Sequence, residues 1–312
     1  MPKLHLDTDL GGDIDDLCAL AMVLNWPEAD LLAVTTVSDD QGRRAGYVRY
    51  GLRLAGREDI PVAAGADISL ECYHPVPGLP TEDTYWPEPI PPLPTPLDQA
   101  LSLLERSIDQ GATIAAIGPY TNLALLEKRT PGILRKAHLY LMGGYVFPPR
   151  EGFPPWENDR DWNIQVDVQS SLLVLQQANP TLVQLSVTAE TWLRRGYLGI
   201  LRKAGPLAQL IAHQAEAYAE ETGYEVQYGQ TCKGLPQDII NFQHDPLACA
   251  IALGWNEGVE ISNVKLRLES RAGSLYQLPA DEGYPAKVVT RVHGDRFSEF
   301  WLNMVARGEH AD

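Results

Sequence analysis

Residues 7–16 read DTDLGGDIDD, a run that places five aspartates within ten residues near the start of the chain. Like charges held this close raise one another's pKa and destabilise a fold unless something compensates them. The run follows a short apolar stretch, KLHL at 3–6, and precedes an almost wholly apolar one, LCALAMVLN at 17–25. These flanks predict a strand, an acidic loop and a buried helix. The question is whether the negative charges of this loop are compensated by a metal ion, serve phosphate chemistry or are only solvated by water.

The first two-thirds of the chain continue this alternation of short apolar strands and helical segments. The further strands that we expect are 30–37, 60–63, 112–117, 137–142 and 181–187, and the helices are 41–55, 97–110 and 170–177. This alternation predicts an α/β fold with an open, mainly parallel, Rossmann-like sheet flanked by helices. After residue 207 we expect an α-rich part, a small antiparallel addition (259–269 and 286–292) and a closing helix at 295–305. Because neither a repeat nor a linker divides the chain, we expect residues 1–312 to form a single domain.

Composition limits the classes of partner. The chain has 312 residues, 45% of them hydrophobic, and a formal net charge of −16. This acidity, without basic runs, argues against nucleic acid and anionic membranes as partners. No apolar stretch approaches the roughly 18 residues that a membrane span needs, and no signal-peptide core is visible. We therefore expect a cytoplasmic protein whose four cysteines are mainly small buried hydrophobes.

Polar residues follow several of the expected strands. Asp7 and Asp9 follow the first strand, residues 38–40 (SDD) the second, residues 118–122 (GPYTN) the strand at 112–117, and Gly143-Gly144 the next. In open α/β sheets ligands bind outside the carboxyl ends of the strands, so these groups indicate one site. Two long segments rich in proline and aromatics, 66–97 and 145–162, interrupt the alternation. Their aromatic content favours ordered walls of that site.

Clustered carboxylates and backbone carbonyls are hard oxygen ligands that suit Ca²⁺ or Mg²⁺, and no His/Cys cluster indicates zinc. An EF-hand loop fits the early positions of the run but fails at its twelfth, where Cys18 stands in place of glutamate. An aspartyl-phosphate phosphatase needs a hydroxyl residue shortly after the Asp-x-Asp and a later lysine, and the sequence supplies neither at a strand end. Helix capping by Asp15 or Asp16 accounts for one carboxylate, not five. The best interpretation is a divalent-cation site.

Eight segments, taken together and in order, resemble the inosine/uridine-preferring nucleoside hydrolase family along essentially the whole chain. They are DTDLGGDIDDLCAL (7–20), LLAVTTVSDD (31–40), PVAAGAD (61–67), IGPYTNLAL (117–125), LYLMGG (139–144), DWNIQVD (161–167), HDPLACA (244–250) and DRFSEF (295–300). The resemblance implies Ca²⁺-dependent hydrolysis of the N-glycosidic bond of a ribonucleoside to free base and ribose. The implied route is attack of metal-activated water on the anomeric carbon through an oxocarbenium-like transition state. The resemblance also implies a homodimer or homotetramer. A non-catalytic metal- or ribose-binding relative is the alternative.

The resemblance implies roles for residues at the matching positions. The Ca²⁺ ligands that it implies are Asp9, Asp16, Asp245 and the backbone carbonyl of Thr121. Asp9 or Asp15 can act as general base, and His244 matches the position that protonates a purine leaving group. The residues expected to contact the substrate are Asp15, Asp40, His74, Asp161, Trp162, Asn163, Tyr224 and Tyr228. For the two tyrosines, packing of the long helix is an equally good interpretation.

The chain departs from the family pattern at several of these positions. The acidic loop is two residues longer, and Leu10 replaces the usual proline. Asp40 stands where asparagine is usual, and Asp161 where glutamate is usual. Near His74, Pro-Val-Pro replaces the family's Gly-x-Asp. The longer loop leaves two places open for Asp13, beside the metal ligands or in solvent at the loop tip, and we favour the first. Purine or pyrimidine preference is not indicated.

Overall fold

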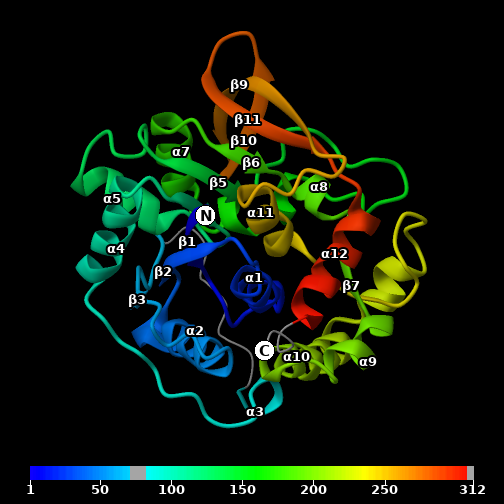
Figure 1. Cartoon of the computed structure of the whole chain (residues 1–312). Helices are drawn as coiled ribbons and strands as arrows, with labels where there is room; N and C mark the ends of the chain where they lie inside the picture. Colours follow the sequence, from blue (N-terminus) through cyan, green and yellow to red (C-terminus); the bar gives the residue numbers. More distant parts are fainter. Residues whose placement is uncertain (71–81, 308–312) are drawn as a thin grey trace.

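A computed structural model describes residues 1–70 and 82–307. Its described residues form a nine-stranded sheet in the order β10-β9-β11-β6-β5-β4-β1-β2-β3. The strands are β1 (Lys3–Thr8), β2 (Asp30–Thr36), β3 (Val62–Ala64), β4 (Thr113–Ala116), β5 (His138–Met142), β6 (Thr181–Val183), β9 (Glu260–Arg271), β10 (Ser274–Ala280) and β11 (Tyr284–Arg291). The strands from β3 to β11 pair in parallel, whereas β9 is antiparallel to both β11 and β10. In Figure 1 this antiparallel part projects from one edge of the molecule.

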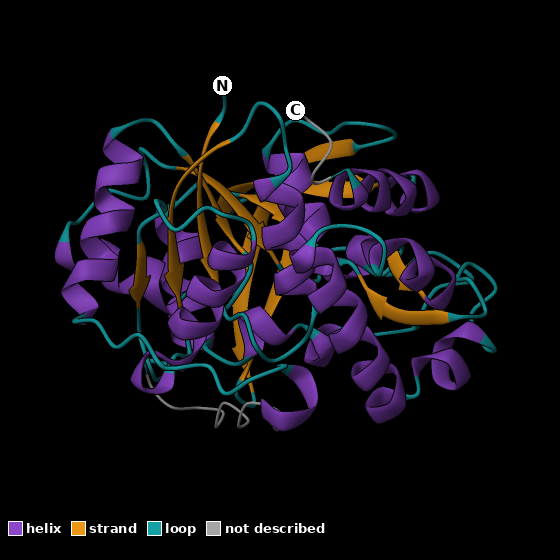
Figure 2. Ribbon diagram, turned by 60° about the horizontal axis from the view of Figure 1, so that its bottom comes forward, coloured by secondary structure: helices purple, strands orange, loops and turns teal. Residues whose placement is uncertain are grey.

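Helices lie on both faces of the sheet (Figure 2). The longer ones are α1 (Asp15–Leu24), α2 (Arg43–Leu54), α4 (Leu97–Asp109), α5 (Thr121–Arg129), α7 (Val168–Gln177), α10 (Pro206–Thr222), α11 (His244–Ala252) and α12 (Gly294–Ala306). Short helices are α3 (Glu82–Tyr85), α6 (Trp162–Gln165), α8 (Leu185–Thr188), α9 (Leu198–Leu201), the 3₁₀ turns η1 (Asp40–Gly42), η2 (Asn158–Arg160) and η3 (Arg195–Tyr197), and the π-helical turn η4 (Glu225–Gly229). A separate ribbon pairs β7 (Trp192–Arg194) with β8 (Ile239–Phe242).

Two hydrophobic cores follow from the alternation of side chains along the strands. In β4, Ile114 and Ala116 belong to one core, which includes residues of α4, α5 and α7. Ala115 between them belongs to the other core, which includes residues of α1, α2, α10, α11 and α12. The central strands are thus buried on both faces, and polar side chains concentrate at the strand ends.

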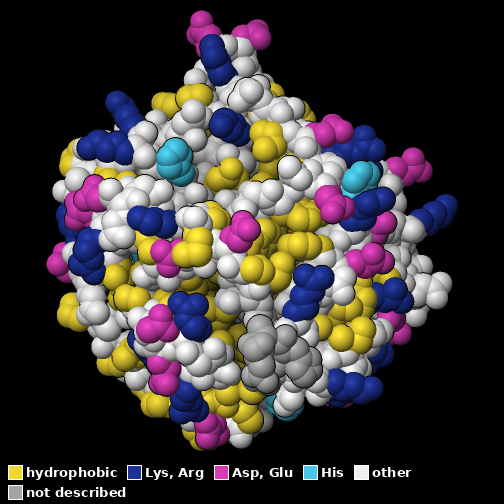
Figure 3. All heavy atoms as spheres, in the orientation of Figure 1, with side chains coloured by type: hydrophobic (Ala, Val, Ile, Leu, Met, Phe, Trp, Pro, Cys, Tyr) yellow, Lys and Arg dark blue, Asp and Glu magenta, His cyan; other side chains and the backbone are white. Residues whose placement is uncertain are grey.

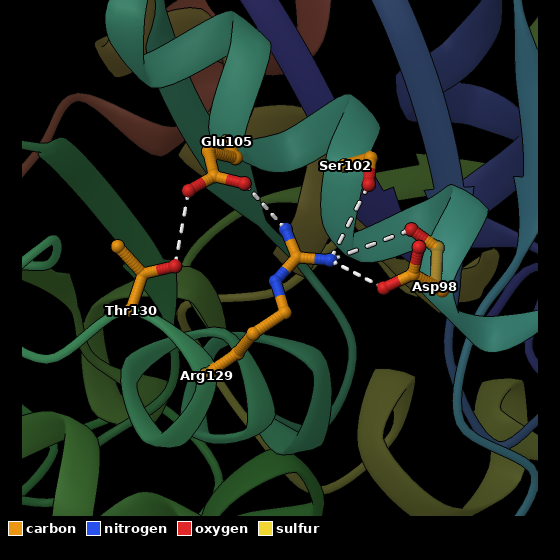
Figure 4. Close-up of polar contacts among 5 residues, drawn as sticks. All are labelled: Asp98, Ser102, Glu105, Arg129 and Thr130. Carbon is orange, nitrogen blue, oxygen red and sulfur yellow. Dashed lines mark hydrogen bonds and ion pairs between the residues drawn. The ribbon is translucent and has the colours of Figure 1, made fainter.

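Helix α5, which begins at the carboxyl edge of the sheet, is tied to α4 at its far end (Figure 4). Arg129 donates to Asp98 at 2.9 Å and to Glu105 at 2.7 Å, and Glu105 also accepts from Thr130 at 3.0 Å. Partly exposed ion pairs of this kind contribute only about 0.2–1 kcal/mol each to stability. The main effect of the network is therefore to orient α5 relative to α4.

The predicted fold class and most predicted elements are confirmed. The expected strand at 181–187 is wrong after Val183, because the chain turns at Gln184 and forms α8. The Gln184 side chain accepts from the backbone N–H groups of Val146 and Phe147 and donates to the Val289 carbonyl, so it fills the place where the strand would continue. Strand β10 was not predicted.

Surface features are consistent with the composition. Figure 3 shows acidic and basic side chains interspersed over the face seen in Figure 1. Among the described residues, no helix is long and apolar enough to cross a membrane.

Candidate active site

The loop between β1 and α1 carries Asp9 and Asp13 and is tightly folded. Gly11 adopts φ +115°, a conformation that residues with a Cβ rarely adopt. The Thr8 hydroxyl donates to the Asp16 carboxylate and accepts from the Leu10 backbone N–H at 3.2 Å. The loop thus brings the first turn of α1 back beside the end of β1.

Three carboxylates converge at this carboxyl edge of the sheet. Oxygen atoms of Asp15, Asp16 and Asp245 all lie within 4.8 Å of one another, and all three side chains are buried. Asp245 lies in the first turn of α11, and its backbone N–H donates to Asp15 at 3.3 Å. Burial, reinforced by mutual repulsion, raises the pKa of all three carboxyl groups well above the usual range.

This set of side chains fits a divalent cation. The aspartates that line one common cavity are Asp9, Asp13, Asp15, Asp16 and Asp245. Burial also raises the pKa of Asp9 and Asp13, so the whole group is costly to ionise without a counter-charge. Carboxylate oxygens are the ligands that Ca²⁺ and Mg²⁺ prefer, and a bound cation would compensate the charges.

One cation of the chain itself lies beside these carboxylates. Arg44 of α2 is 4% exposed and lines the cavity. Its guanidinium donates to the backbone carbonyls of Ser38, at 2.8 Å, and of Asp9. Its positive charge partly offsets the effect of burial on the pKa values of Asp9 and Asp16. Sequence reasoning missed Arg44, although an arginine near the start of the expected helix at 41–55, four residues after the SDD segment, was a usable signal.

Another part of the cavity wall is aromatic. The cavity has a volume of about 360 Å³, which is within the range of small-molecule sites. Its aromatic residues are Trp156, Trp162, Tyr224, Tyr228 and His244. Trp156 lies 5.4 Å from Tyr228 and 5.9 Å from His244 between ring centroids, and its indole N–H donates to the Tyr228 hydroxyl at 3.2 Å. Trp156 was not singled out by residue number, but it lies in the 145–162 segment predicted to form a wall.

His244 is held as a neutral ring. Its Nδ1 lies 2.7 Å from the Thr188 hydroxyl oxygen. That hydroxyl can donate its own proton to the Leu185 carbonyl at 3.1 Å, and in that arrangement Nδ1 is the donor in the contact with His244. Burial lowers the pKa of His244 to about 3. With the proton on Nδ1, Nε2 is left as an acceptor.

The DWN segment is positioned by the ends of β4 and β5. Asn163 lines the cavity and donates to the carbonyls of Ile117 at 2.8 Å and Met142 at 3.1 Å. Trp162 also lines it and is 45% exposed. Asp161 lies behind this wall: its Oδ2 accepts from the Gly144 N–H at 2.6 Å, whereas its buried Oδ1 has no partner among the described residues. Burial raises the pKa of Asp161 to about 7.

Three expected site residues, Thr121, Asp40 and Asp161, do not line the cavity. Thr121 is the first residue of α5, so its carbonyl points along the helix, and its hydroxyl donates to Asp167 at 2.6 Å. Ile117, at the end of β4, lines the cavity where Thr121 does not. Asp40 is exposed in η1, outside the cavity lining. His74 lies outside the described residues.

One side chain that sequence reasoning passed over joins four segments beneath the site. Asn122 donates to Asp7 and to the Thr36 carbonyl, both at 2.8 Å, and accepts from the Ala66 N–H at 2.9 Å. It thereby connects α5 to the ends of β1 and β2 and to the segment after β3. A Cβ on neighbouring Gly65 would lie 2.1 Å from the Thr36 carbonyl oxygen, so only glycine allows this approach.

Fold and site define a metal-dependent hydrolase with an open α/β sheet. A family model described as inosine-uridine preferring nucleoside hydrolase matches residues 4–299, and the chain belongs to this family. The family consists of N-ribosyl hydrolases, which split ribonucleosides into base and ribose.

Known relatives agree with this assignment. The chain is 32% identical over 226 residues, covering 69% of this chain and 70% of the relative, to the pyrimidine-specific ribonucleoside hydrolase RihA of Enterobacter sp. (strain 638). The structure of a plant nucleoside hydrolase, the PpNRh1 enzyme, superposes with a TM-score of 0.78 at 22% identity, over 98% of this chain and 99% of that one. That of a purine-preferring ribonucleoside hydrolase from Gardnerella vaginalis superposes with a TM-score of 0.75 at 20% identity, over 97% and 98% of the two chains. The two structural likenesses establish the fold alone.

Proposed function

We propose that the protein hydrolyses the N-glycosidic bond of ribonucleosides in this cavity, with Ca²⁺ as its cofactor and residues 1–312 as one catalytic unit. The observation that carries the proposal is the convergence of Asp15 and Asp16 with Asp245, from two distant segments, beside an aromatic wall. A carboxylate cluster can bind a cation and stabilise positive charge on a sugar, and an aromatic wall can stack against a flat base.

The cation would be held by Asp16, Asp245 and Asp9. Ca²⁺ takes 6–8 oxygens in irregular geometry, which leaves room for water and sugar hydroxyls. In place of the Thr121 carbonyl, the Ile117 carbonyl is the backbone oxygen that we propose, because Ile117 lines the cavity. The neighbouring Gly118 lies close to Asp9: a Cβ on it would be 2.8 Å from Asp9 Oδ1. When bound, such an ion lowers the pKa of a water molecule and orients it.

The chain's own residues supply the remaining chemistry. Asp9 or Asp15 takes a proton from the attacking water, and both stabilise positive charge that develops on the ribose. Asn163, which the ends of β4 and β5 hold in place, is positioned to bind a sugar hydroxyl. Asp161 supports the same wall from behind through its bond to Gly144.

The base is proposed to lie against Trp156, Trp162, Tyr224 and Tyr228. In the neutral form described above, His244 Nε2 accepts a hydrogen bond from the base rather than donating one. To protonate a leaving base it must first take up a proton, which binding of an anionic leaving group favours.

Ribose release tests this function directly. Purine and pyrimidine ribonucleosides incubated with protein and Ca²⁺ should yield reducing sugar, and exhaustive chelation should abolish the yield and lower the Tm. Nucleoside binding without ribose release would favour the non-catalytic alternative. Unchanged melting after chelation, with no metal in elemental analysis, would remove the cation from the proposal.

A homodimer or homotetramer and a cytoplasmic location are further parts of the proposal; the first rests on the family resemblance and the second on the composition. Light scattering of the purified protein and fractionation of cells test them.

A further inference from the structure

Asp13, in the two-residue extension of the acidic loop, is fully engaged by hydrogen bonds. Its Oδ2 accepts from the Tyr218 hydroxyl at 2.8 Å. Its Oδ1 accepts from the Ile14 backbone N–H and from the Asn241 side-chain amide. Asp13 thereby joins the loop to α10, which carries Tyr218, and to β8, which carries Asn241.

The contact with Tyr218 continues into the aromatic wall. The rings of Tyr218 and Tyr224 meet edge to face, with their centroids 5.8 Å apart. Tyr224 lines the cavity and packs on Tyr228 at 5.0 Å.

The other polar contacts of this wall run to different segments: Trp156 donates to the Tyr228 hydroxyl at 3.2 Å, and Arg195 donates to Glu225 at 3.2 Å. Tyr228 lies in the turn η4 and Tyr224 directly precedes it, and Val226 of this turn is 64% exposed. The segment begins at Gly223, which adopts φ +64° and ends α10. A short turn of this kind is held mainly by the contacts of its side chains, so an anchor on Tyr224 affects where the wall stands.

We propose that Asp13 is a positioning residue that, through Tyr218 and Tyr224, sets the aromatic wall of the base subsite relative to the carboxylates of the sugar and metal subsite. Its two oxygens are occupied by donors from α10, β8 and the loop itself, which leaves it beside the metal ligands rather than among them. The inference rests on the proposed function in one respect, namely that the wall receives the base.

Tyr218→Phe is the direct test, because it removes only the hydroxyl that joins Asp13 to the wall. We expect KM for a ribonucleoside to rise about tenfold, the equivalent of one hydrogen bond to a charged acceptor. The inhibition constant of free ribose and the calorimetric affinity for Ca²⁺ should stay within about twofold, because these probes use the other half of the cavity.

Tyr85→Phe is the matched control. Tyr85 is also buried and also donates to a carboxylate, that of Glu221 on the same helix α10, at 2.5 Å. Glu221 is not part of the cavity lining, so this variant should lose a similar hydrogen bond without a change in KM.

A double-mutant cycle with Asp13→Ala separates positioning from general destabilisation. If Asp13 acts through Tyr218, adding Tyr218→Phe to Asp13→Ala should not raise KM further, whatever the Tm of each variant. Additive losses, an unchanged KM in Tyr218→Phe, or a parallel loss of ribose and Ca²⁺ binding would each overturn the inference. Failure of the wild-type protein to bind Ca²⁺ or release ribose would instead count against the proposed function.

Discussion

Thr188 Oγ1 lies 2.7 Å from His244 Nδ1, although α8 and α11 are 56 residues apart at this contact. When Nδ1 donates in this contact, Nε2 is the ring nitrogen that is left to meet the base. Helix α8 exists because the chain turns at Gln184 instead of continuing as a strand. A local break in β6 therefore orients a candidate catalytic ring.

Thr188→Val should leave His244 in place but free to rotate, because valine matches threonine in shape and lacks the hydroxyl. We expect kcat for ribonucleosides with poor leaving bases to fall roughly tenfold, with Ca²⁺ affinity unchanged. Steady-state kinetics and calorimetry measure the two effects. Thr188→Ser, which keeps the hydroxyl, should retain most activity; equal losses in both variants would show that the methyl group matters rather than the bond.

Asp245→Ala and His244→Ala should separate the cation from the leaving group. Asp245 belongs to the buried carboxylate cluster, so its loss should remove Ca²⁺ binding and turnover together. His244→Ala should bind Ca²⁺ as the wild type does and release poorly activated purine bases more slowly. Calorimetry beside a ribose-release assay checks both, and loss of Ca²⁺ by both variants would remove the leaving-group role of His244.

Gly11→Ala should disturb the acidic loop, whereas Gly12→Ala should be tolerated. Gly11 has φ +115°, where an added Cβ costs about 1–3 kcal/mol. Gly12 has no such conformation, and a Cβ there would lie 3.8 Å from Arg44 Nη1, an ordinary van der Waals contact. Thermal unfolding with and without Ca²⁺ should show a lower Tm and a smaller Ca²⁺-induced rise for Gly11→Ala alone. Identical behaviour of the two alanine variants would mean that the loop tolerates another backbone path.

Asp161 should give the protein a pH-dependent stability that Asp161→Asn lacks. Burial raises its pKa in the folded state to about 7, above the unfolded value near 3.9. The folded protein therefore holds this proton more tightly, and the associated stability is present below about pH 4 and is lost as the pH rises through about 7. Denaturant unfolding at a series of pH values, with Ca²⁺ saturating throughout, should show this loss between pH 4 and 8 in the wild type. If the carboxyl group is instead ionised in both the folded and the unfolded state, the difference in the free energy of unfolding between wild type and Asp161→Asn should not change with pH.

Arg44→Gln should make the thermal stability of the protein depend more strongly on bound Ca²⁺. Arg44 is the buried positive charge beside Asp9 and Asp16, so its removal leaves their repulsion less compensated in the metal-free state. The metal-free Tm at pH 8 should fall, and the rise on adding Ca²⁺ should become larger. Arg44→Lys keeps the charge but cannot donate to the Ser38 and Asp9 carbonyls in the same geometry. If its Tm values with and without Ca²⁺ match those of the wild type, the effect of Arg44 is due to its charge.

Much of the fold could be predicted because its elements are simple apolar patterns. The runs at 30–37 and 112–117 read as buried strands and are β2 and β4. The run at 181–187 is equally apolar, but the hydrogen bonds of Gln184 to Val146, Phe147 and Val289 come from distant segments that no local pattern reveals. Strand β10 pairs with β9 at the edge of the sheet, and its short sequence, SLYQLPA, includes a proline, which is typical of edge strands and weakens the strand pattern.

Site residues could be predicted where they belong to a recognisable motif. They could not be predicted where their position depends on how distant segments pack. Asp15 and Asp16 were chosen from the acidic run and Asp245 from the family resemblance, and the three side chains converge. Thr121 was chosen from a motif in which helix α5 begins, and the start of that helix turns its carbonyl away from the cavity. Arg44 bonds to backbone carbonyls, and Asn122 bonds to backbone groups and to the Asp7 carboxylate, and these partners lie in distant segments that no local pattern reveals.

Asp15 and Asp245 are 230 positions apart in the sequence. They come into contact only when the N-terminal and C-terminal parts of the chain have folded together. A cation that needs both segments finds no complete set of ligands on a partly folded chain, because closing so long a loop comes late. Ca²⁺ should accordingly leave the refolding rate nearly unchanged and slow unfolding instead. For a marginally stable protein in a cell, the cation would then extend the lifetime of molecules that have already folded.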